Sequence, residues 1–232
     1  MNLKALIVIA STLATALASA APTYSESGRC TGGCNYYEGD SEHIWAVENY
    51  HLGPAKKKLA DGRTGYAMKD IEFMLRHFPN NPNALMLLPD AARRLGQPDM
   101  PARYFKQAID AYPDEAMTYL VHGMYLQKRG QTAQAIAQYQ QALSLNPNLP
   151  DGHYNLGLAL VKSKRYAEAN AHAVSAYRLG HPMPGLRNQL KRAGAWNPDA
   201  MAATGPAKTD APEPATDSAP SPPAKADSAA QP

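Results

Sequence analysis

Residues 116–149 read AMTYLVHGMYLQKRGQTAQAIAQYQQALSLNPNL, and residues 150–183 continue as PDGHYNLGLALVKSKRYAEANAHAVSAYRLGHPM. The two 34-residue windows align at many positions without a gap; Gly123, for example, aligns with Gly157. A fixed period of this length indicates that one supersecondary unit is repeated along the chain.

The same period extends upstream in two columns of residues with special backbone properties. The columns are Gly62, Gly96 and Gly130, and Pro79, Pro113 and Pro147. Proline ends a helix because it cannot continue one, and small residues such as Gly and Ala let two helix backbones approach closely. Each unit is therefore predicted to be a pair of helices that ends at a proline.

These windows resemble the tetratricopeptide repeat (TPR) family, whose unit is a helix-turn-helix of 34 residues. The resemblance implies an all-α, TPR-type helix-turn-helix solenoid over residues 42–198. It would contain three clear repeats, one degenerate N-terminal repeat and a C-terminal capping helix. The three clear repeats lie at residues 82–115, 116–149 and 150–183. The degenerate repeat lies at residues 48–81, and the capping helix lies between Pro184 and Gly194.

Prolines disturb the two earliest units. Pro89 stands where the family has glycine, and a proline inside a helix removes one backbone hydrogen bond, so we expect a kink or break there. In the degenerate repeat, Gly53 and Pro54 interrupt the first half. We expect an irregular first helix in that repeat, beginning as far back as Glu42.

The two ends of the chain differ from the repeats in composition. Residues 1–20 combine one basic residue, an apolar run and the small residues Ala18-Ser19-Ala20, the pattern of a cleaved secretory signal peptide. A retained membrane anchor is the alternative, but the run is short and rich in alanine for a span. Residues 21–41 are predicted to form a flexible arm, and the Pro- and Ala-rich residues 199–232 a disordered tail. The predicted location is the periplasm, without stable membrane insertion after signal cleavage.

The only cysteines, Cys30 and Cys34, lie four residues apart around the sequence TGG. In an oxidising compartment such a pair most simply forms a local disulfide. A haem attachment motif would need C-x-x-C-H and is absent, whereas a zinc site or a redox-active pair remains an alternative.

The sequence contains no recognised catalytic or phosphate-binding motif, and the spacing of the histidines matches no metal-ligand signature. We therefore predict no enzyme activity, no cofactor and no metal site. The chain has a formal net charge of +3 and no dense Lys/Arg patch, which argues against nucleic acid as a partner.

In the TPR family the first helix of each unit lines a concave groove, so the resemblance implies the groove residues of this chain. They are Met86, Arg94, Leu120, Met124, Lys128, Tyr154, Leu158 and Lys162. An apolar strip with a basic edge implies a peptide or helix with apolar anchors and some acidic character. Alternatively, the apolar members pack within the chain, and the basic members are solvated ends of helices.

The sequence thus predicts a non-catalytic scaffold that binds a protein or peptide partner, in envelope assembly or secretion. A second hypothesis is a thiol-handling accessory factor for the maturation of a periplasmic complex or cytochrome, acting through Cys30 and Cys34. A third is a structural subunit that associates with itself through the solenoid.

Overall fold

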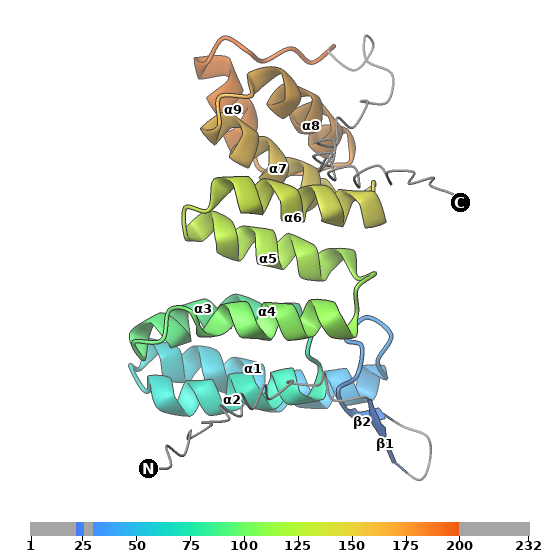
Figure 1. The fold of residues 1–232 in the computed structure, drawn as a ribbon, viewed down its shortest axis with the longest axis vertical. Helices are drawn as coiled ribbons and strands as arrows, with labels where there is room; N and C mark the ends of the chain where they lie inside the picture. The colour runs from blue at the N-terminus through green and yellow to red at the C-terminus, as the bar shows by residue number, and fades with distance from the viewer. Residues whose placement is uncertain (1–21, 26–29, 200–232) are drawn as a thin grey trace, which may run out of the picture.

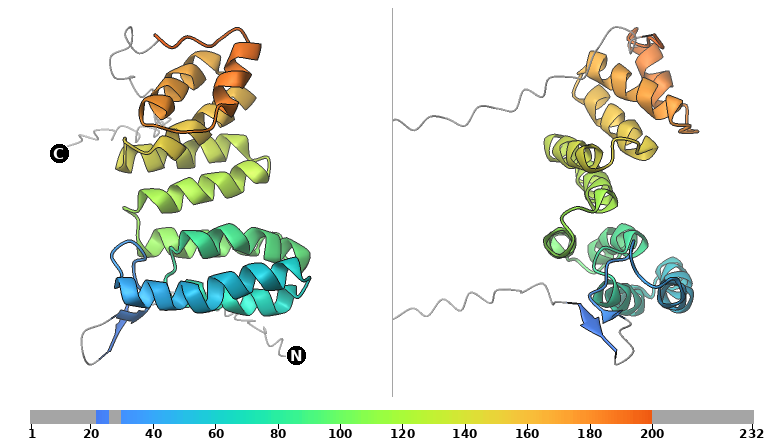
Figure 2. Two further views of the ribbon diagram at one scale, coloured as in Figure 1. Left: turned by 180° about the vertical axis from the view of Figure 1, so that it is seen from behind. Right: turned by 90° about the vertical axis from the view of Figure 1, so that its right-hand side faces the viewer.

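The computed structural model describes residues 22–25 and 30–199, in which helices stacked in pairs form one elongated solenoid (Figures 1 and 2). The helices are α1 (Ser41–Ala60), α2 (Thr64–His77), α3 (Pro82–Arg94), α4 (Met100–Ala111), α5 (Ala116–Lys128), α6 (Thr132–Leu145), α7 (Pro150–Lys162), α8 (Tyr166–Arg178) and α9 (Gly185–Arg192). The all-α repeat fold predicted from the sequence is confirmed. The predicted signal peptide and all but the first residue of the predicted tail lie outside the described residues.

The glycine column forms the turn between the two helices of each unit. Gly62, Gly96 and Gly130 have φ angles of +73°, +71° and +77°. This left-handed conformation carries no steric penalty for glycine, whereas a side chain makes it costly. The equivalent residue of the next unit is Lys164, which adopts the same conformation with φ of 61°. The backbone turn is therefore kept even where glycine is not.

The centre of each later repeat is a close contact made by glycine. A Cβ atom on Gly123 of α5 would lie 2.5 Å from Cε1 of Tyr139 on α6, and one on Gly157 of α7 would lie 2.4 Å from Cδ2 of Leu186 on α9. Tyr139 is fully buried, and its hydroxyl donates to Oε1 of Gln127 at 2.7 Å. Glycine at these positions thus sets the distance between neighbouring helices, as the sequence predicted.

Helix α9 closes the C-terminal end of the stack. Its two leucines, Leu186 and Leu190, are fully buried, and its other face carries exposed polar residues. The Trp196 ring packs back onto Tyr177 of α8, with 5.9 Å between ring centroids. These contacts agree with the cap predicted from the sequence.

Both helices with an internal proline are longer and more regular than predicted. Helix α1 runs without interruption from Ser41 through Pro54 to Ala60, so the expected irregular partner of α2 is a regular helix. Helix α3 likewise continues through Pro89, and the predicted break is absent. A proline removes only one hydrogen bond, and the residues on the following turn hold the helix in place. Ala55 after Pro54 and Ala92 after Pro89 are both fully buried.

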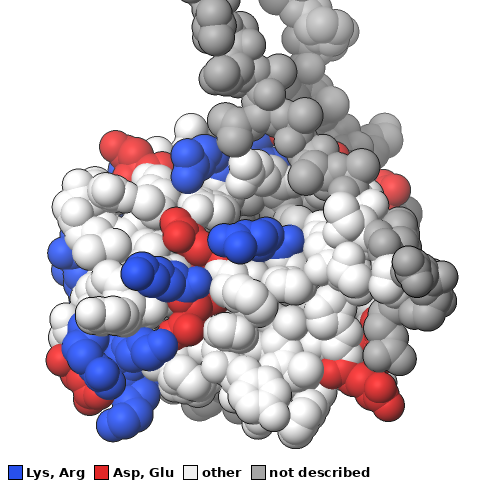
Figure 3. Space-filling view, turned by 90° about the horizontal axis from the view of Figure 1, so that it is seen from below, with Lys and Arg blue, Asp and Glu red and all other residues white. Residues whose placement is uncertain are grey.

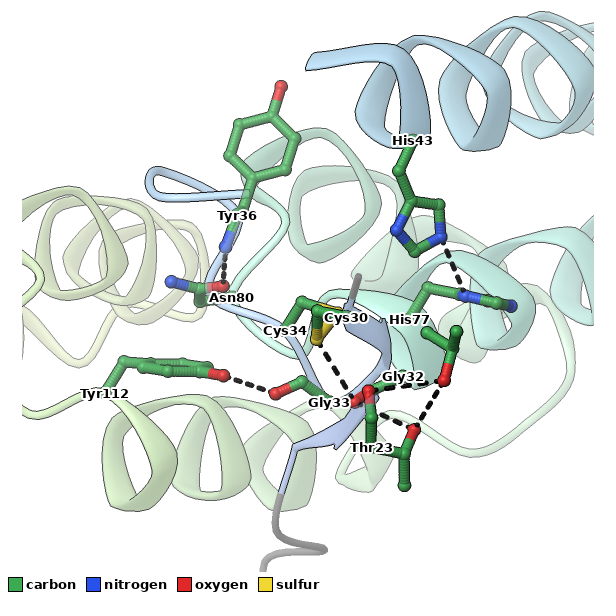
Figure 4. Close-up of a disulfide and its surroundings, with 11 residues drawn as sticks. Thr23, Cys30, Gly32, Gly33, Cys34, Tyr36, His43, His77, Asn80 and Tyr112 are labelled. Carbon is green, nitrogen blue, oxygen red and sulfur yellow. Dashed lines mark hydrogen bonds between the residues drawn. A yellow bond between two sulfur atoms is a disulfide. The ribbon is translucent and has the colours of Figure 1, made fainter. Parts of the chain in front are cut away.

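The predicted flexible arm is partly built into the fold. Strand β1 (Thr23–Tyr24) pairs antiparallel with β2 (Cys30–Gly32), and a Cys30–Cys34 disulfide follows (Figure 4). Backbone bonds tie the next residues to the end of α2: Gly33 N–H donates to Arg76 O at 3.0 Å, and Cys34 N–H donates to His77 O at 2.8 Å. Residues 30–37 therefore pack against the helices instead of standing clear of them.

Candidate functional site

A pocket of about 460 Å³ opens between α3 and α5, the first helices of two consecutive units. Its lining residues come from α3, from the turn after α3 and from α5 with its C-cap. They are Met86, Pro89, Asp90, Arg93, Pro98, Tyr125, Lys128 and Arg129. A smaller hollow shares four of these residues and extends the apolar surface to Met124.

The floor of the pocket is apolar and partly exposed. Met86 is 48% exposed, which is high for a methionine in the middle of an amphipathic helix. Beside it lie the Pro89 ring and Tyr125, whose ring stacks on Phe105 of α4. Methionine adapts its shape to different apolar groups, so this floor can accept an aliphatic or aromatic side chain.

The negative charge of Asp90, the acidic residue in the pocket lining, is balanced by two arginines. Arg93 donates to Oδ1 of Asp90 at 2.6 Å, and Arg94 pairs with Oδ2 at 2.8 Å. Burial acts to raise the pKa of Asp90, but the hydrogen bonds from Arg94 and Arg93 outweigh it and lower the pKa below its ordinary value. Asp90 therefore stays ionised and holds both guanidinium groups in place.

The two cations of α5 differ in their partners. Arg129 is engaged by Asp99 at 2.8 Å, by Pro98 O at 2.7 Å and by the Tyr125 hydroxyl at 3.0 Å. Lys128, in contrast, is exposed and has no ion-pair partner among the described residues. Lys128 is thus the cation of this pocket that is available for an incoming anionic group.

The structure brings only some of the predicted groove residues together. Met86, Met124 and Lys128 meet at the pocket and the adjoining hollow. Arg94 lies beside it but turns back to donate to Leu59 O at 2.7 Å. Leu120 is only 2% exposed, so the prediction that it lines an open groove is wrong. It belongs to the core between units.

The predicted groove does not continue along α7, because α9 covers that part of it. Tyr154 is 6% exposed and stacks on His181 at 3.8 Å between ring centroids, so its predicted role as a groove residue is also wrong. Leu158 is partly buried and Lys162 is exposed, and neither lines the pocket. The covering of Tyr154 could not be read from the repeat pattern, because α9 lies outside it.

Several residues that line the pocket were not predicted from the sequence. The sequence predicts only a kink or break at Pro89, and Tyr125 and Arg129 are not among the predicted groove residues, yet all three line the pocket. Pro98 enters from the turn. The available signal was Pro89 at the position where the family has glycine, because a proline ring prevents a close helix contact of the kind that Gly123 makes.

Other candidate chemistry is sparse within the described residues. No group of three or more His, Cys, Asp or Glu side chains lies close enough there to hold a metal ion. None of the described helices combines the length and the apolar character needed to cross a membrane. The face formed by α1 and α2 mixes side chains of both charges beside an uncharged area (Figure 3).

Comparisons with known proteins agree with this architecture. The family model for the TPR repeat matches residues 126–164. The chain is 30% identical over 82 residues to the peroxisomal targeting signal receptor of Candida albicans, which is 35% of this chain but only 14% of that receptor. The chain therefore spans a small part of this curated relative.

Two solved structures share the fold over most of the chain. PilF of Pseudomonas aeruginosa superposes with a TM-score of 0.51 at 18% identity, covering 70% of this chain and 78% of PilF. PilW, described as a type IV pilus biogenesis factor, superposes with a TM-score of 0.50 at 22% identity, covering 64% of this chain and 71% of PilW. Together with the 34-residue helix pairs, these matches show that the chain has the TPR fold, and the family model identifies a TPR repeat at residues 126–164.

Proposed function

We propose that this protein is a non-catalytic scaffold that binds a segment of a partner protein in the pocket between α3 and α5. The observation that carries the proposal is an exposed apolar floor beside Lys128, a cation without an ion-pair partner in the part of the chain that the structure describes. The class of ligand is an extended peptide or a short helix with one apolar anchor and a carboxylate next to it.

The expected binding energy comes mainly from one apolar side chain of the ligand, with a smaller contribution from the attraction between its carboxylate and Lys128. Burying a Leu- or Phe-sized side chain on Met86 and Pro89 contributes about 1.5–3 kcal/mol. Attraction to an exposed lysine adds about 0.2–1 kcal/mol and weakens as salt is added. Affinity from this pocket alone is therefore modest, and a natural partner is expected to contact further surface of the solenoid.

The proposed location is the periplasm. The sequence pattern of residues 1–20 supports it, as does the Cys30–Cys34 disulfide, because disulfides persist in oxidising compartments. PilF and PilW share the fold, and PilW is described as a type IV pilus biogenesis factor. A role in envelope assembly or secretion is part of the same proposal. The hypothesis of a thiol-handling factor is less well supported, since Cys34 is only 3% exposed.

The test is selection of binding peptides from a random display library on the purified full chain. The proposal expects selected peptides to combine a large apolar residue with Asp or Glu. Lys128→Glu should reduce their affinity in a manner that salt suppresses, and Met86→Asp should reduce it at every salt concentration. Lys191→Glu is the matched control, because Lys191 is an exposed lysine on α9, away from the pocket. Equal effects at Lys128 and Lys191 would refute the pocket as the binding site.

A further inference from the structure

The segment of residues 30–37, here called the strap, contacts two successive repeats and reaches the N-cap residue of α5, where the third repeat begins. At its disulfide end, the backbone N–H groups of Gly33 and Cys34 donate hydrogen bonds to the last turn of α2. At Tyr36 it reaches the turn between α2 and α3, where its N–H donates to Oδ1 of Asn80 at 2.9 Å. The amide of Asn80 in turn donates to Oδ1 of Asn35 at 2.8 Å.

Two further bonds carry the strap to the junction between α4 and α5. The hydroxyl of Tyr112, the C-cap residue of α4, donates to Gly33 O. Nδ2 of Asn35 donates to Oε1 of Glu115, the N-cap residue of α5, at 3.0 Å. In Figures 1 and 2 this junction and the strap lie on the same side of the solenoid.

These bonds give the junction a support from outside its own repeat. The Glu115 side chain makes no capping bond to the N-terminus of α5 and accepts a hydrogen bond from Asn35 of the strap. Helix α5 carries Tyr125 and Lys128 on one side of the pocket, and α3 carries Met86 on the other. The strap is therefore hydrogen-bonded to the junction from which α5, one wall of the pocket, begins.

We propose that the Cys30–Cys34 disulfide is a redox-controlled clasp that holds the strap against the α4–α5 junction and so fixes the pocket between α3 and α5. In the oxidised chain the five-residue ring keeps Gly33 and Cys34 in position for their bonds to α2 and Tyr112. In the reduced chain the ring opens, the strap detaches more often, and the junction is held less firmly. This device acts on α5 whatever ligand the pocket binds.

The chemical step is thiol–disulfide exchange with a dithiol reductant. A thiolate of the reductant attacks Sγ of Cys30, the less buried of the two residues, and Cys34 leaves as a thiolate that takes up a proton. The second thiol of the reductant then displaces Cys30, which also takes up a proton. The protein gains two electrons and two protons, and the dithiol becomes a cyclic disulfide.

Amide hydrogen exchange of the full chain, with and without a reductant, tests the clasp. The loop-closure relation for so small a ring predicts that reduction raises the opening equilibrium of the strap about thirtyfold. Exchange at Gly33, Cys34 and Tyr36 should accelerate accordingly. Exchange over residues 112–118 should accelerate about fivefold for each strap bond that is lost. The helices α7 and α8, which the strap does not contact, should be unchanged.

Two variants separate the clasp from general destabilisation. Tyr112→Phe in the oxidised chain removes one strap bond with the disulfide intact, and should accelerate exchange over residues 112–118 about fivefold. Tyr66→Phe is the matched control, because Tyr66 is 62% exposed on α2 and makes no bond to the strap. The proposal is overturned if reduction frees the strap while residues 112–118 keep their exchange rates. It is overturned equally if reduction leaves the strap protected or accelerates α7 and α8 to the same extent.

Discussion

Replacing Gly123 with alanine tests how the central repeat is packed. The added Cβ would lie 2.5 Å from Cε1 of Tyr139, well inside the van der Waals contact distance of about 3.5–4.0 Å. The ring has no free space to enter, since Tyr139 is fully buried, and moving it would disturb the 2.7 Å bond to Gln127. The close contact can therefore be relieved only by shifting α5 away from α6.

The expected loss follows from three contributions. Overpacking costs about 1–3 kcal/mol, and the disturbed hydrogen bond costs about 1 kcal/mol. The better helix propensity of alanine returns about 1 kcal/mol. The net loss of about 1–3 kcal/mol lowers Tm by about 2–4 °C for each kcal/mol in a chain of this size.

Thermal unfolding followed by circular dichroism measures the effect, in both a wild-type and a Tyr139→Leu background. In the second background the obstructing ring is absent, so Gly123→Ala should become neutral or stabilising. Gly65→Ala on α2 is the control, because a Cβ there would meet nothing within 4 Å. If Gly123→Ala has the same effect in both backgrounds, the contact between α5 and α6 does not work as described.

Three further outcomes are expected. Lys164→Gly should raise stability by about 0.5–1 kcal/mol, because it relieves the left-handed backbone at φ of 61°; a lower Tm would contradict this. Burial, reinforced by the neighbouring His153, lowers the pKa of His172 to about 4. Between about pH 6.5 and 4 the unfolded chain therefore binds more protons at this residue than the folded chain does. The free energy of unfolding should fall by at most about 3 kcal/mol as the pH drops through that range. Urea midpoints at pH 7 and pH 4.5 measure this loss, which should be smaller in His172→Gln; an equal loss would exclude His172 as its source. Leu120→Ala should lower the free energy of unfolding in urea by about 2–5 kcal/mol, because Leu120 is a core residue. A loss below about 1 kcal/mol would indicate that Leu120 lines the groove instead.

The repeat pattern predicted the parts of the fold that contacts between adjacent units determine. The 34-residue period located the turns at Gly62, Gly96 and Gly130 and the close approach at Gly123, because each of these features repeats with the backbone. The pattern also encoded Met86 and Lys128, which do face the pocket. The sequence of this chain therefore predicts the structural features that are local or that repeat with the 34-residue period.

Features that depend on contacts outside the period could not be predicted. Tyr154 aligns with Met86 in the repeat, yet it is buried because His181 and α9 lie against it. The strap contacts join residues far apart in sequence, as Asn35 and Glu115 are separated by 80 positions. No propensity or spacing rule connects such residues, so the arm could only be predicted as loosely attached.

The most direct test of the proposed pocket is NMR of the methionine methyl groups during titration with a selected peptide. Met86 and Met124 line the pocket and its adjoining hollow, and Met183, which is 57% exposed and lines neither, is an internal control. The account predicts that the methyl signals of Met86 and Met124 shift and saturate together, whereas that of Met183 stays in place. A peptide that binds while leaving the Met86 signal unchanged would contradict the claim that this protein holds its partner between α3 and α5.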